Sequence, residues 1–142
     1  MDLRDIYVTH YDRERLRTLL EAEMEIGHSD RQALEMLRNE LERAHIVDAA
    51  AIPSDVVTMD SRIRLTDVDT NEVFIYTVVF PSEANVARRK ISVLAPIGTA
   101  LLGYQVGDAV EWPVPGGVRK LRIEEILYQP EAAANSPRAS VY

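Results

Sequence analysis

Residues 91–117 read ISVLAPIGTALLGYQVGDAVEWPVPGG, and this stretch decides the fold because it holds several structural elements in a short space. Residues 92–94 are typical of a β-strand, and Pro96 suits the first position of a helix, where its missing N–H is not needed. The apolar run at residues 100–102 predicts that this helix is short, and Gly103 is suited to end it.

The same stretch continues with two turn signals. Gly107-Asp108 predicts a turn, after which residues 109–112 resume a strand pattern. The Pro-Gly-Gly at residues 115–117 predicts a hairpin that leads into a longer strand at 118–127. Such a dense alternation of strands, turns and one short helix is more typical of a recognition domain than of an active site.

Upstream of this stretch, the sequence has the two-residue periodicity that is typical of β-strands. After Pro53, residues 56–59 and 62–65 predict strands, residues 67–71 predict a turn rich in Asp and Asn, and residues 73–80 predict another strand. With the strands farther on, these segments predict a mostly antiparallel sheet with one short helix against it. The predicted class is α+β.

The N-terminal region has helical periodicity. Thr9, with Asp12 three residues later, predicts an N-cap, and Gly27 predicts the end of this helix. Ser29, with Gln32, predicts the start of a second helix. Two antiparallel helices of about 14 residues each follow from this pattern, and each extends about 20 Å at about 1.5 Å per residue.

Composition limits what the chain can be. Its 142 residues include no cysteine, which excludes disulfides, thiolate nucleophiles and Cys-ligated zinc. The longest apolar runs fall far short of the roughly 20 residues that cross a bilayer. The N-terminus lacks the apolar core of a signal peptide, so a cytoplasmic protein without membrane contact is expected.

The charge of the chain limits its partners. A formal net charge of −7 disfavours a protein that holds nucleic acid by neutralising phosphates, so any DNA contact is expected to be weak. A protein or cation partner fits better. Residues 88–90, Arg-Arg-Lys, form one basic cluster, which is interpreted mainly as a solvated loop at a strand edge, with contact to an acidic partner as the alternative.

The order of motifs in residues 91–117 resembles the carboxy-terminal domain of the bacterial transcript-cleavage Gre factors. In those proteins a strand, a small-residue-Pro step, an ALLG-type helix, VGD and PGG follow one another in the same order. Residues 55–63, DVVTMDSRI, and residues 128–133, YQPEAA, are similar to the family of regulators of nucleoside diphosphate kinase, which are Gre-like proteins with a shortened hairpin. The resemblance covers about the last two thirds of the chain.

The resemblance implies a division of the chain. Residues 1–48 would form a short helical hairpin of coiled-coil type, and residues 49–130 a Gre-type C-terminal domain with the fold of the FKBP peptidyl-prolyl isomerases. Residues 131–142 are expected to be a flexible tail.

The resemblance also implies a partner, RNA polymerase, because Gre factors grip a coiled coil on its largest subunit near the secondary channel. This chain has Leu-Ala where Gre proteins commonly carry a polar residue and Ser before the Pro, which favours an apolar contact. We predict that polymerase binds at the positions matching the Pro step and its flanks: Leu94, Ala95, Pro96, Ile97, Gly98 and Leu101. Leu101 also fits a core position on an amphipathic helix.

In Gre factors a much longer hairpin carries acidic residues into the polymerase, where they help to hold a catalytic magnesium ion. The acidic residues near the predicted tip here are Glu21, Glu23, Glu25 and Asp30. Because the hairpin is short, we expect solvated tip residues and no catalytic role, so the chain would be a noncatalytic regulator that competes with Gre factors. Its effect on nucleoside diphosphate kinase would be indirect. The alternative is an active cleavage factor in which these carboxylates bind magnesium.

An isomerase or chaperone is a further alternative, since fold does not establish activity. Phe74 and Tyr76 share one face of a predicted strand and could line a proline pocket, although a core position is favoured. The three histidines are too scattered to suggest a metal site or an acid-base pair. No cofactor and no metal are expected.

Overall fold

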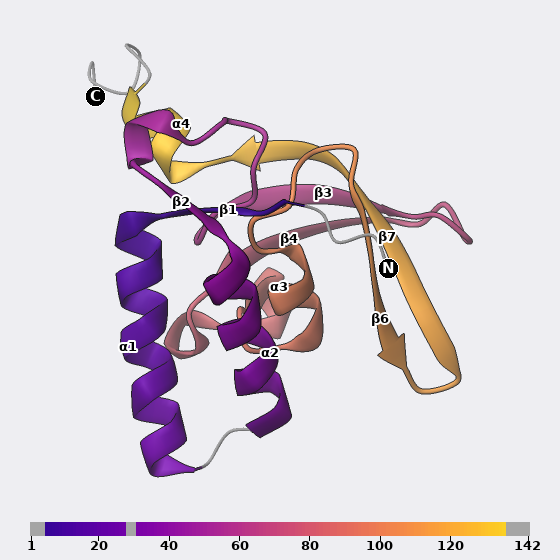
Figure 1. Cartoon of the computed structure of the whole chain (residues 1–142). Helices are drawn as coiled ribbons and strands as arrows, with labels where there is room; N and C mark the ends of the chain where they lie inside the picture. The colour runs from indigo at the N-terminus through magenta and orange to yellow at the C-terminus, as the bar shows by residue number, and fades with distance from the viewer. Residues whose placement is uncertain (1–4, 28–30, 136–142) are drawn as a thin grey trace.

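The computed structural model describes residues 5–27 and 31–135, and it has an α+β architecture in which helices lie against one side of a curled sheet (Figure 1). The strands are β1 (Tyr7–Thr9), β2 (His45–Val47), β3 (Arg62–Asp67), β4 (Val73–Val79), β5 (Lys90–Ser92), β6 (Ala109–Val114) and β7 (Gly117–Tyr128). The helices are α1 (His10–Ile26), α2 (Arg31–Arg43), α3 (Pro96–Leu101) and α4 (Pro130–Asn135), with 3-10 turns η1 (Ala49–Ala51), η2 (Pro81–Glu83) and η3 (Val86–Arg88).

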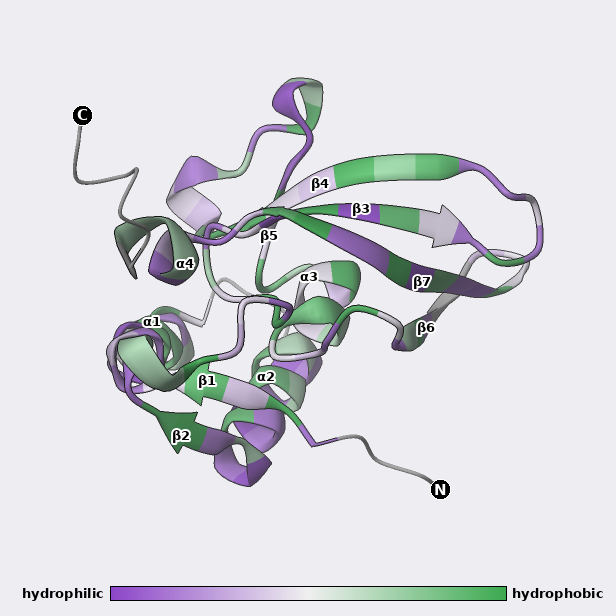
Figure 2. Cartoon of the chain, turned by 90° about the horizontal axis from the view of Figure 1, so that it is seen from above, coloured by the Kyte–Doolittle hydropathy of each residue, from purple (hydrophilic) through white to green (hydrophobic). Residues whose placement is uncertain are grey.

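The main sheet has the strand order β5-β4-β3-β7-β6. The pairs are antiparallel except β4 and β5, which run parallel, so the predicted mostly antiparallel sheet is confirmed. Buried and more exposed residues alternate along β3, and Figure 2 shows the matching alternation of hydropathy. This two-residue period arises because successive side chains point to opposite faces of a sheet.

The capping residues predicted for the first helix are confirmed. The Thr9 side chain accepts a hydrogen bond of 3.0 Å from the backbone N–H of Asp12, and Gly27 ends α1 in the left-handed conformation with φ of 76°. The helix has 17 residues, so at about 1.5 Å per residue it extends roughly 25 Å, somewhat more than the expected 20 Å. Ser29 and Asp30 lie outside the described residues.

One hydrophobic core joins the helices to the sheet. It includes Leu16 of α1 and Leu37 of α2 together with Ile63 of β3, Leu101 of α3 and Ile123 of β7, all with 0% exposure. The boundary at residue 48 stays a prediction, and core contacts cross it.

Residues 56–59 do not form the predicted strand. Only Val56 makes an isolated bridge, with Gln105, and the backbone bonds of the segment go instead to several different elements. All four side chains are buried. The strand prediction for residues 56–59 was therefore wrong. A loop that is buried within the fold also needs apolar residues, so its sequence can be mistaken for that of a strand.

The strands β1 and β2 and the helix α4 were not predicted from the sequence. The short strands β1 and β2 pair in parallel beside the base of α1 and α2. Residues 130–135 form α4 where a flexible tail was expected to begin, and the Gln129 side chain just before it donates hydrogen bonds of 2.9 and 2.8 Å to the carbonyls of Pro53 and Val56. These bonds hold the start of α4 against the loop before β3.

Candidate functional site

The segment that leaves β5 and enters α3, residues 92–98, is called here the β5–α3 corner, and hydrogen bonds make it rigid. The Ser92 hydroxyl accepts a bond of 3.0 Å from the Leu94 N–H, and the Ser92 carbonyl accepts one of 3.0 Å from the Ala95 N–H. The Thr99 hydroxyl in α3 donates a bond of 2.6 Å back to the Val93 carbonyl. The start of α3 is therefore fixed relative to the strand before it.

Gly98 has a steric role in the corner. A Cβ atom at this position would lie 2.2 Å from the Ser92 carbonyl oxygen, which is closer than any real contact of that kind. Because the helix packs with its backbone directly on the turn, only glycine fits there. Gly98 is thus required for the shape of the corner, and its own surface is buried.

The predicted docking residues differ in how much surface they offer. Pro96 is exposed, whereas Leu94, Ala95 and Ile97 are half-buried. Leu94 and Ile97 also pack on the hydrophobic core. Leu101 is fully buried, so its side chain supports the corner from beneath and offers no surface to a partner. The accessible part of the corner is an apolar step centred on Pro96.

The predicted tip of the helical hairpin carries exposed acidic residues. Glu21 and Glu25 are exposed and Glu23 is half-buried near the end of α1, while Asp30 lies outside the described residues. Glu21 and Glu25 lie one helical turn apart, where like charges repel mildly in water. Within residues 5–27 and 31–135, the structure brings no three Asp, Glu, His or Cys side chains into an arrangement that could hold a metal ion.

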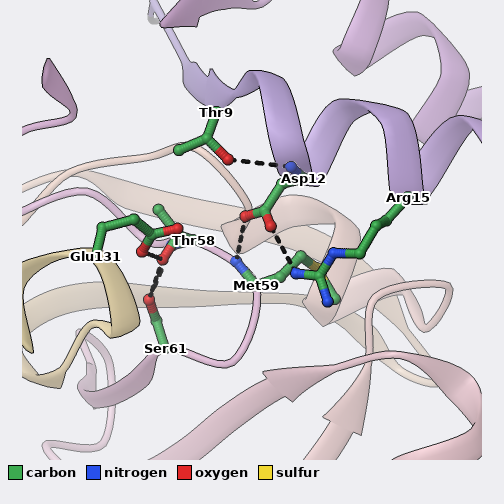
Figure 3. A network of polar contacts seen from close by, with 7 residues as sticks. All are labelled: Thr9, Asp12, Arg15, Thr58, Met59, Ser61 and Glu131. Carbon is green, nitrogen blue, oxygen red and sulfur yellow. Dashed lines mark hydrogen bonds and ion pairs between the residues drawn. The ribbon is translucent and has the colours of Figure 1, made fainter. Parts of the chain in front are cut away.

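A buried carboxylate joins α1 to the loop before β3, a role that the sequence did not reveal (Figure 3). One oxygen of Asp12 accepts a bond of 3.1 Å from the Met59 N–H, and the other accepts one of 2.7 Å from the Arg15 guanidinium. The Asp12 side chain is only 2% exposed. From the sequence, Asp12 was interpreted only as a companion of the Thr9 cap.

Beside Asp12, a second set of polar contacts holds α4. The Thr58 hydroxyl donates a bond of 2.7 Å to Glu131, and the Thr58 and Ser61 hydroxyls lie 2.8 Å apart (Figure 3). Burial raises the pKa of the Glu131 carboxyl, and the bond from Thr58 opposes this rise. The base of the hairpin, the 56–61 loop and α4 therefore meet in one polar network.

Backbone bonds connect this network region to the end of α3. The Val57 N–H donates to the Tyr104 carbonyl at 2.9 Å, and the Gly103 N–H donates to the Val57 carbonyl at 2.8 Å. The Tyr7 N–H of β1 donates to the Gly103 carbonyl at 3.2 Å. Gly103 has φ of 85°, a left-handed conformation that glycine adopts without strain. The strand that leads into α1 is thus bonded to the residues that end α3.

The aromatic pair that could have lined a proline pocket lies on β4. Phe74 and Tyr76 stack with their ring centroids 5.9 Å apart, and both are half-buried against the hydrophobic core. The Arg119 guanidinium lies 4.7 Å from the Phe74 ring centroid. The two rings thus pack on each other and on the core, and a charged side chain covers the Phe74 ring.

Comparison with known proteins gives matches along almost the whole chain. The family model for the C-terminal part of the GreA/GreB transcription elongation factors matches residues 52–128, and the model for the Rnk N-terminus matches residues 4–47. A regulator of nucleoside diphosphate kinase from Escherichia coli is 40% identical over 131 residues, covering 92% of this chain and 94% of the relative. The elongation factor GreA from Clostridium botulinum is 41% identical over 90 residues, covering 63% of this chain and 56% of the relative.

A solved structure agrees with these matches. The GreA/GreB transcription elongation factor from Nitrosomonas europaea superimposes with a TM-score of 0.74 at 42% identity, covering 87% of this chain and 100% of that chain. Fold and sequence together define a protein of the GreA/GreB class.

Within that class, the chain belongs to the family of regulators of nucleoside diphosphate kinase, in which an Rnk-type N-terminus precedes a GreA/GreB-type C-terminal region. Its relatives are named as regulators or elongation factors, and the chain is accordingly a regulator of the transcription-factor type. Across the part of the chain that the structure describes, every helix is too short or too polar to span a bilayer.

Proposed function

We propose that this protein is a noncatalytic regulator that docks on bacterial RNA polymerase through the β5–α3 corner. The partner surface is the coiled coil of the largest polymerase subunit near the secondary channel, as the Gre resemblance implies. The proposal rests mainly on the exposure of Pro96, which is flanked by half-buried Leu94, Ala95 and Ile97. Hydrogen bonds hold the corner that carries these residues rigid. A preorganised apolar step loses little freedom when a partner binds it.

The short hairpin supports a competitive role. We infer that α1 and α2 form a coiled-coil-like hairpin on an FKBP-like domain and lie at the channel entrance when the corner is docked. An arm of roughly 25 Å, or 17 residues, leaves the exposed Glu21 and Glu25 well short of the reach of the longer Gre hairpin. The protein would then block Gre factors without stimulating RNA cleavage. Any effect on nucleoside diphosphate kinase would follow indirectly from transcription.

Two alternatives rest on other parts of the chain, the hairpin tip and the aromatic pair on β4. If the tip carboxylates reach the polymerase centre despite the short arm, the protein would stimulate transcript cleavage. If Phe74 and Tyr76 open to admit a proline ring, it would be an isomerase or chaperone. The packing of both rings on the core favours a structural role for them.

The test is competition for core RNA polymerase between this protein and a labelled Gre factor, with RNA cleavage in stalled complexes as a second readout. Pro96→Glu is the informative variant, because an acidic residue at the first helical position suits the helix dipole while it places a charge in the apolar step. Val86→Glu is the matched control, since Val86 is 91% exposed on η3, outside the corner.

We expect the wild type and Val86→Glu to displace the Gre factor, and Pro96→Glu to lose at least about tenfold in affinity, as for a charge set into an apolar interface centre. No variant should stimulate cleavage. Stimulated cleavage would establish the catalytic alternative, and equal binding by Pro96→Glu and Val86→Glu would exclude the corner as the docking surface.

A further inference from the structure

Beside the base of α1, two aromatic rings enclose an arginine. The Arg15 guanidinium carbon lies 4.3 Å from the Tyr11 ring centroid and 4.7 Å from that of Phe80. Tyr11 is nevertheless 67% exposed, so most of its ring faces solvent. Tyrosine and arginine are among the residue types that most often dominate the binding energy of protein interfaces.

This stack lies between two hollows that share Tyr11 and Arg15. One, with a volume of about 280 Å³, lies toward Asp60 and the start of α4. The other, of about 470 Å³, lies toward Phe80 and Glu83 and has mostly apolar walls. Together they form one surface on the α1 side, which is called here the Tyr11 groove.

The charges around the Tyr11 groove are predominantly negative. The charge of Arg15 is already compensated by Asp12 at 2.7 Å. Glu131, Asp60 and Glu83 line the two hollows, and no ion pair to Asp60 or Glu83 occurs within the described residues. Burial, and after it the nearby charge of Glu83, raise the pKa of Asp60, although Arg15 and Lys90 act in the opposite direction. Asp60 and Glu83 can therefore still form ion pairs with a positively charged group of a partner.

We propose that the Tyr11 groove binds a basic segment of a partner protein, with an arginine of that segment stacked on the Tyr11 ring and paired with Asp60 and Glu83. The open aromatic face favours guanidinium over ammonium, because guanidinium is planar and weakly hydrated. Acidic segments and nucleic acid would be repelled by the same carboxylates. This interaction is additional to the proposed polymerase docking and uses a different surface.

The test is titration of the full-length protein with octaarginine and, separately, octalysine, followed by calorimetry and by amide chemical shifts. The groove variant is Asp60→Asn/Glu83→Gln. Asparagine tolerates the left-handed backbone of Asp60, whose φ is 67°. The matched control is Asp69→Asn/Glu111→Gln, which removes the same charge from two exposed positions outside the groove. Thermal unfolding of each variant verifies that it is folded.

We expect octaarginine to shift the amide signals of residues 11–15, 80, 82 and 83. The groove variant should bind it about tenfold more weakly, against less than about twofold for the control. Tyr11→Ala should weaken octaarginine binding more than octalysine binding. Equal weakening by the two charge variants would mean nonspecific attraction to an acidic protein and would overturn the proposal. Absence of saturable binding, or amide shifts confined to other surfaces, would overturn it too.

Discussion

Replacing Asp12 by alanine should destabilise the protein far more than its position in the first turn of a helix suggests. The substitution leaves the Met59 N–H without its acceptor and the half-buried Arg15 without its carboxylate partner. A hydrogen bond to a charged group contributes about 1.5–3 kcal/mol, and an acidic residue in the first turn about 0.3–1 kcal/mol. Since the Asp12 side chain is only 2% exposed, we expect a loss of about 3 kcal/mol in the free energy of unfolding.

The assay is urea unfolding with linear extrapolation, supported by thermal unfolding, in which the midpoint should fall by about 10 °C for a chain of this size. Asp12→Asn keeps one acceptor oxygen and should lose roughly half as much free energy. The control is Glu14→Ala on the same turn, whose side chain is 60% exposed and should matter by less than about 0.5 kcal/mol. If Asp12→Ala and Glu14→Ala cost the same, the buried network does not hold the hairpin to the sheet.

Three further predictions concern single positions. Gly98→Ala should cost about 3 kcal/mol or more by urea unfolding, or prevent folding, because its Cβ would meet the Ser92 carbonyl. Gly27→Ala, with open space around it, should cost only about 1 kcal/mol. Thr9→Ala removes the N-cap of α1 and should cost about 1 kcal/mol, measured in the same way. The pKa of Asp67 is lowered by hydrogen bonds from backbone N–H groups of its own turn and by a nearby arginine. The stability that Asp67 contributes is therefore present above its unfolded pKa and lost as pH falls through the folded one. The difference in urea midpoint between wild type and Asp67→Asn should be largest near neutral pH and should shrink as pH falls below the ordinary pKa of an aspartate.

What could be predicted from the sequence depended on short-range chemistry. The Thr9 cap and the Gly27 stop of α1 are set within a few residues, and so are the Pro96 start of α3 and the hairpin between β6 and β7. Strand β3 followed from alternation because one of its faces is more buried than the other, and β4 followed from its run of β-branched and aromatic residues. Each of these signals can be interpreted without knowing which distant residues the segment contacts in the folded chain.

The features that escaped prediction depend on distant partners. Asp12 bonds to the Met59 N–H, 47 residues away, and nothing local marks it as buried. Strands β1 and β2 have three residues each, which is too short for a period to be visible. The 56–59 loop has apolar residues because it is enclosed, and its backbone bonds go to Tyr104, Gly103 and Asp12 and not to a neighbouring strand.

The same long-range contacts bear on how the docking surface and the hairpin act together. Gly103, which follows α3, accepts the N–H of Tyr7 in β1 and donates its own N–H to Val57. Two residues beyond Val57, the Met59 N–H is bonded to Asp12 in the first turn of α1. The start of the hairpin is thus fixed to the end of a six-residue helix whose other end is the proposed polymerase contact. Docking at Pro96 would therefore also set the direction in which α1 points. Loosening Asp12 should then weaken competition with Gre factors without changing the contact surface itself.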